Sequence, residues 1–231
     1  MEAIVLAGGK AERLGDAAAG IPKPLVPVAG RPLAAYQVDL LVRAGVRRVI
    51  VACAAGQEAQ FESALSGLGA EIVTAGEPEP LGRGGGIRFA AGRREEPGPV
   101  YALNGDELLD VDLATLLERH RSVGALATVA VARPKSQFGV VDLGPGDAVT
   151  GFREAGRVPY WVNCGVYVLA DEVLGRFPER GDHERTTFPE LAAEGRLYGY
   201  RHEGVWLTVN TPKELRAAAE YLAAHPEWPA A

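Results

Sequence analysis

Short runs of β-branched and other apolar residues alternate with longer segments of helical spacing from Ala3 to Ala132. The apolar runs are Ala3–Ala7, Arg48–Cys53, Glu71–Thr74, Val100–Leu103 and Leu126–Ala132. The helical segments between them are 33–44, 58–68, 86–93 and 113–123. Runs that are apolar throughout are typical of strands buried on both faces. The alternation therefore predicts an α/β fold with a mostly parallel sheet between helices, and a ligand crevice at the carboxyl ends of its strands.

The pattern changes after Gln137. The stretch FGVVDLGPGDAVTGF predicts two short strands around a Gly-Pro-Gly-Asp turn, and WVNCGVYVLA then returns the chain to the sheet. Near the end, Thr211 is a predicted N-cap, with Pro212 in the first helical position and Glu214 completing a capping box. No repeat, low-complexity linker or charge block divides the chain. We expect one domain over residues 1–231, with a small lobe at about 137–165.

Composition excludes several classes of partner. The formal net charge is -6 and basic residues are spread along the 231 residues, which argues against nucleic-acid and anionic-lipid surfaces. Cys53 and Cys164 lie in apolar runs without metal-ligand spacing and are predicted to be buried thiols. The first apolar run is too short for a signal peptide or a membrane span. We expect a cytoplasmic protein that binds small molecules, and the sequence allows a homo-oligomer.

The stretch LAGGKAERLGDAAAGIPKPL follows the first predicted strand. Gly8 and Gly9 allow backbone N–H groups to approach an anion, because no Cβ atom blocks it. Arg13 can donate to two phosphate oxygens at once, and Lys23, which lies between two prolines, can act as a point charge. These residue types predict a polyphosphate site. An ordinary strand-to-helix turn of an α/β protein is the alternative that the residues alone leave open.

Asp106 is the first candidate metal ligand. The attack of one phosphate on another brings two anions together, so a divalent cation is needed to neutralise them. Asp106 lies in the NGD segment just beyond the strand Val100–Leu103, at the predicted crevice. The alternative is a carboxylate that closes an Asx turn. Asp112 fits better as the N-cap of the helix that begins at Leu113.

Five segments, in one order along nearly the whole chain, resemble the nucleotidyltransferases that join a nucleoside triphosphate to a sugar 1-phosphate. They are LAGG-x-x-x-R-L with PKPLVPVAGRPL, then EPEPLGRGGGIRFA, LNGDEL, NCGVYVL and GVWLTVNTPKEL. The resemblance implies a Rossmann-like three-layer α/β/α fold of the nucleotide-diphospho-sugar transferase type. It also implies a Mg²⁺-dependent enzyme, in which the acceptor phosphate attacks the α-phosphorus and pyrophosphate leaves. Positioning and charge stabilisation would then account for the rate.

The resemblance also implies roles for individual residues. Arg13 and Lys23 would be the catalytic cations. The nucleotide would contact Leu6, Ala7, Gly8, Gly9, Glu77, Gly82, Arg83, Gly84 and Gly85. The acceptor would contact Gly139, Glu154 and Asn163. Asp106 and Asn210 would hold Mg²⁺, because Thr208 occupies the family's usual second aspartate position. The N-acetylglucosamine 1-phosphate uridylyltransferases use an asparagine two residues later, and an amide oxygen is an acceptable ligand.

Glu77 bears on the choice of base. It occupies the position where the uridylyltransferases have a glutamine that helps to read the base. A carboxylate only accepts hydrogen bonds, and guanine offers two adjacent donors, whereas uracil offers one N–H between two carbonyls. This position therefore favours GTP. The alternative is a surface glutamate between two prolines.

Several positions depart from the family pattern. Ala11 replaces a frequent glycine, which predicts a different loop geometry. The acceptor-phosphate lysine that should follow Glu154 is missing, with Arg153 or Arg157 as substitutes. Arg13-Leu14-Gly15 is similar to the molybdenum cofactor guanylyltransferases, so transfer to a pterin phosphate is an alternative. A nucleotide-sensing protein that has lost turnover is another.

Two histidines show no pattern of partners in the sequence. We expect His183 and His202 at solvated loop and strand positions. Tyr160 and Trp161 are predicted to pack in the core or the small lobe rather than to form a sugar platform.

Overall fold

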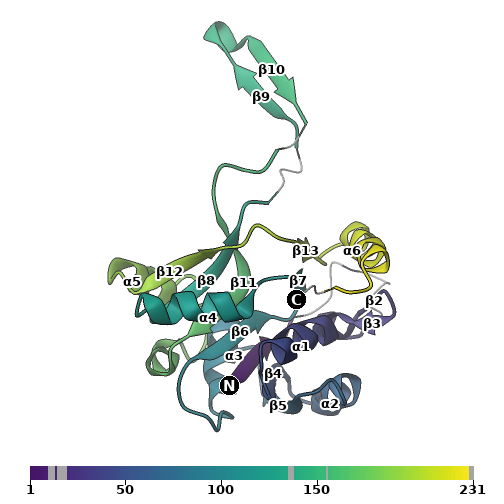
Figure 1. The fold of residues 1–231 in the computed structure, drawn as a ribbon, viewed down its shortest axis with the longest axis vertical. Helices are drawn as coiled ribbons and strands as arrows, with labels where there is room; N and C mark the ends of the chain where they lie inside the picture. The colour runs from purple at the N-terminus through teal and green to yellow at the C-terminus, as the bar shows by residue number, and fades with distance from the viewer. Residues whose placement is uncertain (10–13, 15–19, 135–137, 155, 229–231) are drawn as a thin grey trace.

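A seven-stranded sheet forms the centre of the molecule (Figure 1). The computed structural model describes residues 1–9, 14, 20–134, 138–154 and 156–228. β11 runs antiparallel to its neighbours β6 and β8, and the other neighbouring pairs in this sheet are parallel. In sheet order the strands are β12 (Leu197–Arg201), β8 (Ala127–Ala132), β11 (Val162–Leu169), β6 (Val100–Asn104), β1 (Glu2–Leu6), β4 (Arg48–Ala54) and β5 (Glu71–Glu77).

Helices cover both faces of this sheet. One face packs against α1 (Leu33–Arg43), α2 (Glu58–Leu65) and α4 (Leu113–Ser122). The other face packs against α3 (Gly82–Ala91), the 3₁₀ helix η4 (Asp171–Arg176) and α5 (Thr187–Ala193). Successive strand residues point to opposite faces, so Ile4 and Val5, both fully buried, belong to two different cores. This arrangement confirms the predicted three-layer α/β fold.

The predicted strands and helices of the first half are all present, with ends that differ by a few residues. The largest difference is at α3, which begins at Gly82 rather than Gly86. The edge strand β12 had not been predicted. Its sequence LYGYR is half-exposed and short, so it lacks the continuous apolar character of the central strands. Cys53 and Cys164 are buried and free, as expected.

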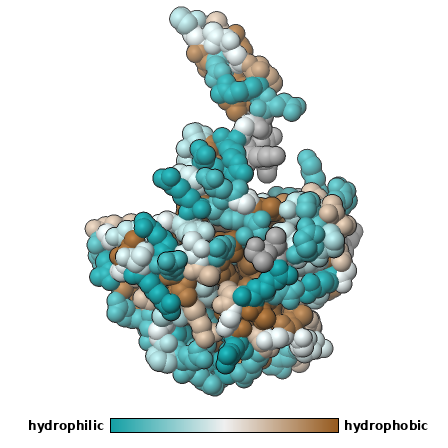
Figure 2. All heavy atoms as spheres, in the orientation of Figure 1, coloured by the Kyte–Doolittle hydropathy of each residue, from teal (hydrophilic) through white to brown (hydrophobic). Residues whose placement is uncertain are grey.

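A hairpin of β9 (Val140–Leu143) and β10 (Val149–Arg153) extends away from the body of the molecule (Figure 1). The register pairs Phe152 with Val141 and Val149 with Leu143, so these four side chains lie on one face. All four are exposed, and Figure 2 shows the apolar atoms along the hairpin in brown. The two predicted strands are therefore confirmed.

The C-terminal helix α6 (Pro212–Ala224) packs beside the opening segment of the chain. Its N-terminus has the predicted capping box, formed by Thr211 and Glu214. A third apolar cluster joins α6 to the start of α1 and to the short strand pair β2 (Pro27–Val28) and β3 (Arg31–Pro32). A second short pair is formed by β7 (Glu107–Leu109) and β13 (Trp206–Thr208). Among the described residues, no helix has both the length and the apolarity needed to cross a membrane.

The prediction of solvated histidines is wrong at both positions. His183 is fully buried, with its ring centroid 4.6 Å from Phe188 and 5.3 Å from both Tyr167 and Phe177. Neither of its ring nitrogens has a hydrogen-bond partner among the described residues. His202 is also buried, and its Nε2 lies 2.9 Å from the Val205 carbonyl oxygen and 3.2 Å from Asp110 Oδ1. The polarity of the local sequence predicted solvent exposure for both histidines. In the structure, residues that are distant in the sequence pack around both rings.

Burial of His183 should make the fold sensitive to acid. Burial lowers the pKa of His183 from 6.5 to about 4, so the unfolded chain takes up a proton before the folded one does. The corresponding stability is present above pH 6.5 and is lost as the pH falls towards 4. From pH 7 to 5 this loss is about 2 kcal/mol. Between pH 7 and pH 5, the free energy of unfolding measured in urea should therefore fall by about 2 kcal/mol less for His183→Phe than for the unsubstituted protein. Equal losses would contradict the assignment.

Candidate active site

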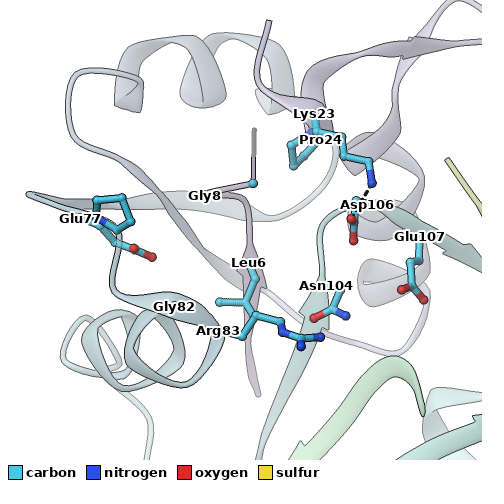
Figure 3. A pocket seen from close by; sticks show the side chains of 12 residues that line it. Leu6, Gly8, Lys23, Pro24, Glu77, Gly82, Arg83, Asn104, Asp106 and Glu107 are labelled. Atoms are coloured by element: carbon cyan, nitrogen blue, oxygen red, sulfur yellow. Dashed lines mark hydrogen bonds and ion pairs between the residues drawn. The ribbon is translucent and has the colours of Figure 1, made fainter. Parts of the chain in front are cut away.

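A pocket of about 360 Å³ opens at the carboxyl ends of β1, β5 and β6 (Figure 3). This is the sheet edge at which the sequence predicted a ligand crevice. Polar side chains and glycines from several separate segments line it, so the tertiary fold assembles the pocket. The lining residues are Leu6, Gly8, Gly9, Lys23, Pro24, Glu77, Pro80, Gly82, Arg83, Asn104, Asp106 and Glu107.

Lys23 joins two of the predicted metal ligands. Its Nζ donates to Asp106 Oδ2 and to Asn210 Oδ1, each at 2.7 Å, across sequence separations of 83 and 187 residues. The Lys23 side chain is only 9% exposed, so the ammonium group is held in place rather than solvated. Pro22 precedes the short 3₁₀ helix Lys23–Leu25 that presents it, and Pro24 lies within that helix. The structure thus brings Lys23, Asp106 and Asn210 together at one point.

Backbone contacts fix the positions of Asp106 and Asn210. The N–H of Gly105 donates to the Leu6 carbonyl oxygen at 2.8 Å, which ties the turn after β6 to the end of β1. A Cβ atom at Gly105 would lie 2.4 Å from that oxygen, so only glycine fits here. Asn210 directly precedes the N-cap of α6, and its backbone N–H donates to Glu214 at 2.7 Å. The capping box therefore also orients the amide ligand.

Asp106 and Asn210 fit a magnesium ion by the chemistry of their donor atoms. Both present an oxygen to the ammonium group of Lys23, so the point between them attracts a cation. Proteins usually hold Mg²⁺ with one or two carboxylates and leave the other positions to water and substrate phosphates. Among the described residues, no group of three or more His, Cys, Asp or Glu side chains could hold a metal. The remaining ligands would have to come from water and a bound phosphate.

Glu107 is a pocket residue that the sequence reasoning missed. Burial, together with the negative charge of Asp106, raises the pKa of Glu107 to about 7, although the Trp206 hydrogen bond opposes the rise. Trp206 Nε1 donates to Glu107 Oε2 at 2.8 Å. In the sequence, the position of Glu107 directly after the NGD segment was the available signal for a pocket residue. That signal is weak, because only the β7–β13 pairing buries the side chain.

Glu77 ends β5 and is buried beside the glycines of the pocket. It is 8% exposed, and its Oε2 accepts a hydrogen bond from the Leu81 N–H at 3.1 Å. Burial raises the pKa of Glu77, and the Leu81 hydrogen bond opposes this. A Cβ atom at Gly86 would lie 2.7 Å from Glu77 Oε1, so glycine makes room for the carboxylate. The alternative of a surface glutamate is therefore wrong.

The glycine-rich start of α3 serves two purposes. Gly82 and Arg83 line the pocket, as the resemblance implied. Gly84 and Gly85 lie outside the pocket lining. Their N–H groups donate to the Gly181 carbonyl oxygen at 2.9 and 3.3 Å. They allow the 178–183 loop to pack directly on the helix. Ala7 also lies outside the pocket lining, and its N–H donates to Ala52 in the neighbouring strand at 2.7 Å.

Arg83 is fixed by two carboxylates rather than left available for phosphate. Its guanidinium group lies 2.6 Å from Asp182 and 2.8 Å from Glu184. Glu184 also accepts a hydrogen bond from Asn163 Nδ2 at 2.5 Å, and that amide nitrogen lies 2.7 Å from the Tyr167 hydroxyl. Asn163 is therefore connected through Glu184 to the wall of the pocket. The sequence reasoning missed Glu184.

None of the three predicted acceptor residues, Asn163 included, lines the pocket. Gly139 and Glu154 lie at the base of the β9–β10 hairpin, are exposed and do not line it. Arg153, a proposed substitute for the missing lysine, pairs with Asp142 on the hairpin itself. The sequence predicts that these residues flank or belong to a hairpin. It does not determine the direction in which the hairpin extends from the body of the molecule. Arg13 and Ala11 lie outside the described residues.

Residues 2–225 match the sequence model of the nucleotidyl transferase family, so the chain belongs to this family. Over 234 residues it is 36% identical to the mannose-1-phosphate guanylyltransferase of Mycobacterium tuberculosis, with 95% of this chain and 64% of the relative covered. It is 31% identical to the mannose-1-phosphate guanylyltransferase catalytic subunit beta of Xenopus tropicalis, with 99% and 68% covered. The chain thus spans about two thirds of the length of these relatives.

Solved structures show the same fold. HddC from Yersinia pseudotuberculosis superposes with a TM-score of 0.74 at 20% identity, over 96% of this chain and 99% of that chain. The same protein has been crystallised with GMP-PN. A putative glucose-1-phosphate thymidylyltransferase from Bacillus anthracis gives a TM-score of 0.76 at 17% identity, over 96% and 95% of the two chains. These likenesses confirm the nucleotide-diphospho-sugar transferase fold predicted from the sequence.

The close approach at Gly105 can be tested. Gly105→Ala should push the turn that carries Asp106 away from β1, because the new Cβ atom overlaps the Leu6 carbonyl oxygen. We expect nucleoside triphosphates to bind at least about tenfold more weakly to this variant, equivalent to about 1.4 kcal/mol. Gly175→Ala is the matched control, since nothing lies within 4 Å of a Cβ atom there. Unchanged binding by Gly105→Ala, measured by calorimetry, would show that the turn does not position the site.

Proposed function

We propose that this chain transfers a nucleoside monophosphate from a nucleoside triphosphate to a sugar 1-phosphate and releases pyrophosphate. The observation that carries this proposal is the meeting of Lys23, Asp106 and Asn210, at 2.7 Å for each contact with Lys23, at a pocket that Lys23, Asp106, Gly8 and Gly9 line. A buried cation next to two oxygen ligands suits a reaction between two phosphates. Membership of the nucleotidyl transferase family and the names of its relatives support the same chemistry.

The reaction is an in-line displacement at the α-phosphorus. An oxygen of the acceptor phosphate forms the new bond to this phosphorus, while the bond to the bridging oxygen of pyrophosphate breaks. The attacking phosphate is already ionised near neutral pH, so no protein base is needed. Mg²⁺, held by Asp106 and Asn210, would neutralise charge on the phosphates.

Lys23 provides a positive charge beside the reacting groups. Its buried ammonium group contacts the two oxygens that would hold Mg²⁺, so it would turn towards the phosphates when the ion binds. The N–H groups of Gly8 and Gly9 would hold the phosphate chain at the end of β1. The joint presence of Lys23, Asp106 and Asn210 favours turnover over a nucleotide sensor.

GTP is the nucleotide that Glu77 favours. Its carboxylate is buried at the pocket wall, where it can accept hydrogen bonds from the two adjacent donors on guanine. The first relatives are named as guanylyltransferases acting on mannose 1-phosphate, which supports GTP and that sugar phosphate as the substrates to test first.

Asp106→Asn should lower pyrophosphate release from GTP and mannose 1-phosphate by at least about 100-fold, because it removes the only charged metal ligand of the pair. The matched control is Asp147→Asn, which alters an exposed carboxylate in the turn of the hairpin and should retain full activity. A coupled pyrophosphate assay across a Mg²⁺ series measures both variants. Wild-type turnover by Asp106→Asn at saturating Mg²⁺ would remove Asp106 from the mechanism.

Glu77→Gln should change the choice of base. An amide presents one donor and one acceptor, so we expect kcat/KM for GTP to fall about 10- to 100-fold while UTP gains relative to GTP. A panel of the four nucleoside triphosphates, assayed with one sugar phosphate, measures the ratio. A preference of the unsubstituted protein for UTP would overturn the guanine assignment.

A further inference from the structure

Two arginines lie against one tryptophan at the edge of the sheet that carries the pocket, and a third arginine contacts the backbone of one of them. The guanidinium carbons of Arg133 and Arg201 lie 5.0 and 5.3 Å from the Trp161 ring centroid. Arg157 donates to the Arg133 carbonyl oxygen at 3.1 Å. All four side chains belong to exposed residues. We call these four residues the arginine–tryptophan cluster.

The cluster has an excess of positive charge in a chain whose net charge is -6. Arg133, Arg157 and Arg201 form no ion pair among the described residues, whereas Arg83 and Arg94, for example, each have carboxylate partners. Asp110, which lies beside His202 near Arg157, already accepts from the Val205 N–H at 2.6 Å and contacts His202. Arg133 and Arg201 lie against the same ring, so their charges repel one another, and a bound anion would relieve that repulsion.

The strand register places the cluster in line with the predicted acceptor residue Asn163. Arg201 pairs with Val131 on β8, and Val131 pairs with Asn163 on β11. Arg201 therefore lies in the same row of the sheet as Asn163, two strand spacings or about 10 Å away. Trp161 directly precedes β11, two residues before Asn163, and its ring lies against Arg201 of the same row. β6, whose end leads to Asp106, is the next strand beyond β11.

This distance separates the cluster from the reacting phosphates. The backbone of Arg201 lies about three strand spacings, or about 14 Å, from β6. A phosphate held at the end of β6 would therefore lie well away from the Arg201 backbone. The long arginine side chains span part of this distance, and a sugar with an anionic group at each end can span the rest.

We propose that the arginine–tryptophan cluster binds a second anionic group of the acceptor, a phosphate at the end of the sugar opposite the reacting 1-phosphate. This inference rests on the proposed nucleotidyl transfer. The planar guanidinium groups can donate pairs of hydrogen bonds to phosphate oxygens, and the Trp161 ring and the Arg133 backbone limit their movement beforehand. The acceptor would extend from Lys23 past Asn163 to Arg201.

Direct binding tests the site without turnover. Calorimetry with mannose 6-phosphate should show binding that weakens at least tenfold in Arg133→Ala and in Arg201→Ala, and that Arg201→Lys partly restores. Arg216→Ala, an exposed arginine on α6, is the matched control and should bind as the unsubstituted protein does. Trp161→Phe should abolish the change in tryptophan fluorescence that accompanies binding. Equal affinity for inorganic phosphate and mannose 6-phosphate, or the same affinity in all variants, would overturn the proposal.

A kinetic comparison connects the site to the acceptor. With GTP, mannose 1,6-bisphosphate should have a KM at least tenfold below that of mannose 1-phosphate, and Arg201→Ala should remove this difference without changing kcat for mannose 1-phosphate. Equal KM values in the unsubstituted protein would reject the cluster as an acceptor site while leaving the proposed transfer intact. Turnover of neither sugar would instead count against the proposed transfer, and the binding experiment would still decide the anion site.

Discussion

The contact of one buried ammonium group with two oxygens organises the pocket. Lys23 connects the opening segment to the end of β6 through Asp106 and to the start of α6 through Asn210. A buried lysine without these partners would be costly, because its charge would lose hydration without compensation. The contact therefore requires the turn after β6 and the capping box of α6 to lie where they do. Because the two oxygens attract a cation, the same place suits a reaction between two phosphates.

Close packing at glycine supports this arrangement from two sides. Gly105 allows the turn bearing Asp106 to touch β1, and Gly86 leaves space for the buried carboxylate of Glu77. A Cβ atom at Gly105 would push away the turn that carries Asp106, and a Cβ atom at Gly86 would push away the Glu77 carboxylate. The glycines of α3 thus serve the shape of the pocket and the seating of the 178–183 loop, in addition to any contact with a nucleotide.

The acceptor side of the pocket is built differently from the nucleotide side. Asn163 is held through Glu184 to Arg83, whose positive charge is already neutralised by Asp182 and Glu184. The unpaired positive charges lie further along the sheet edge, around Trp161. The β9–β10 hairpin, with four apolar side chains on one exposed face, extends beyond them. On this side the neutralised arginine therefore lies at the pocket, and arginines without an ion pair among the described residues lie further from it.

The sequence by itself determined the layered sheet, the strand-end turns and the capping box of α6, because apolar periodicity and local backbone chemistry act over a few residues. The family resemblance also placed Lys23, Asp106 and Asn210 in one site. Only the tertiary structure decided that Glu107 lines the pocket while Gly84 and Gly85 do not, that Glu184 holds Arg83 and Asn163, and that His183 is buried. Each of these outcomes depends on which distant segment covers a side chain, and a local pattern of residues carries no information about that partner.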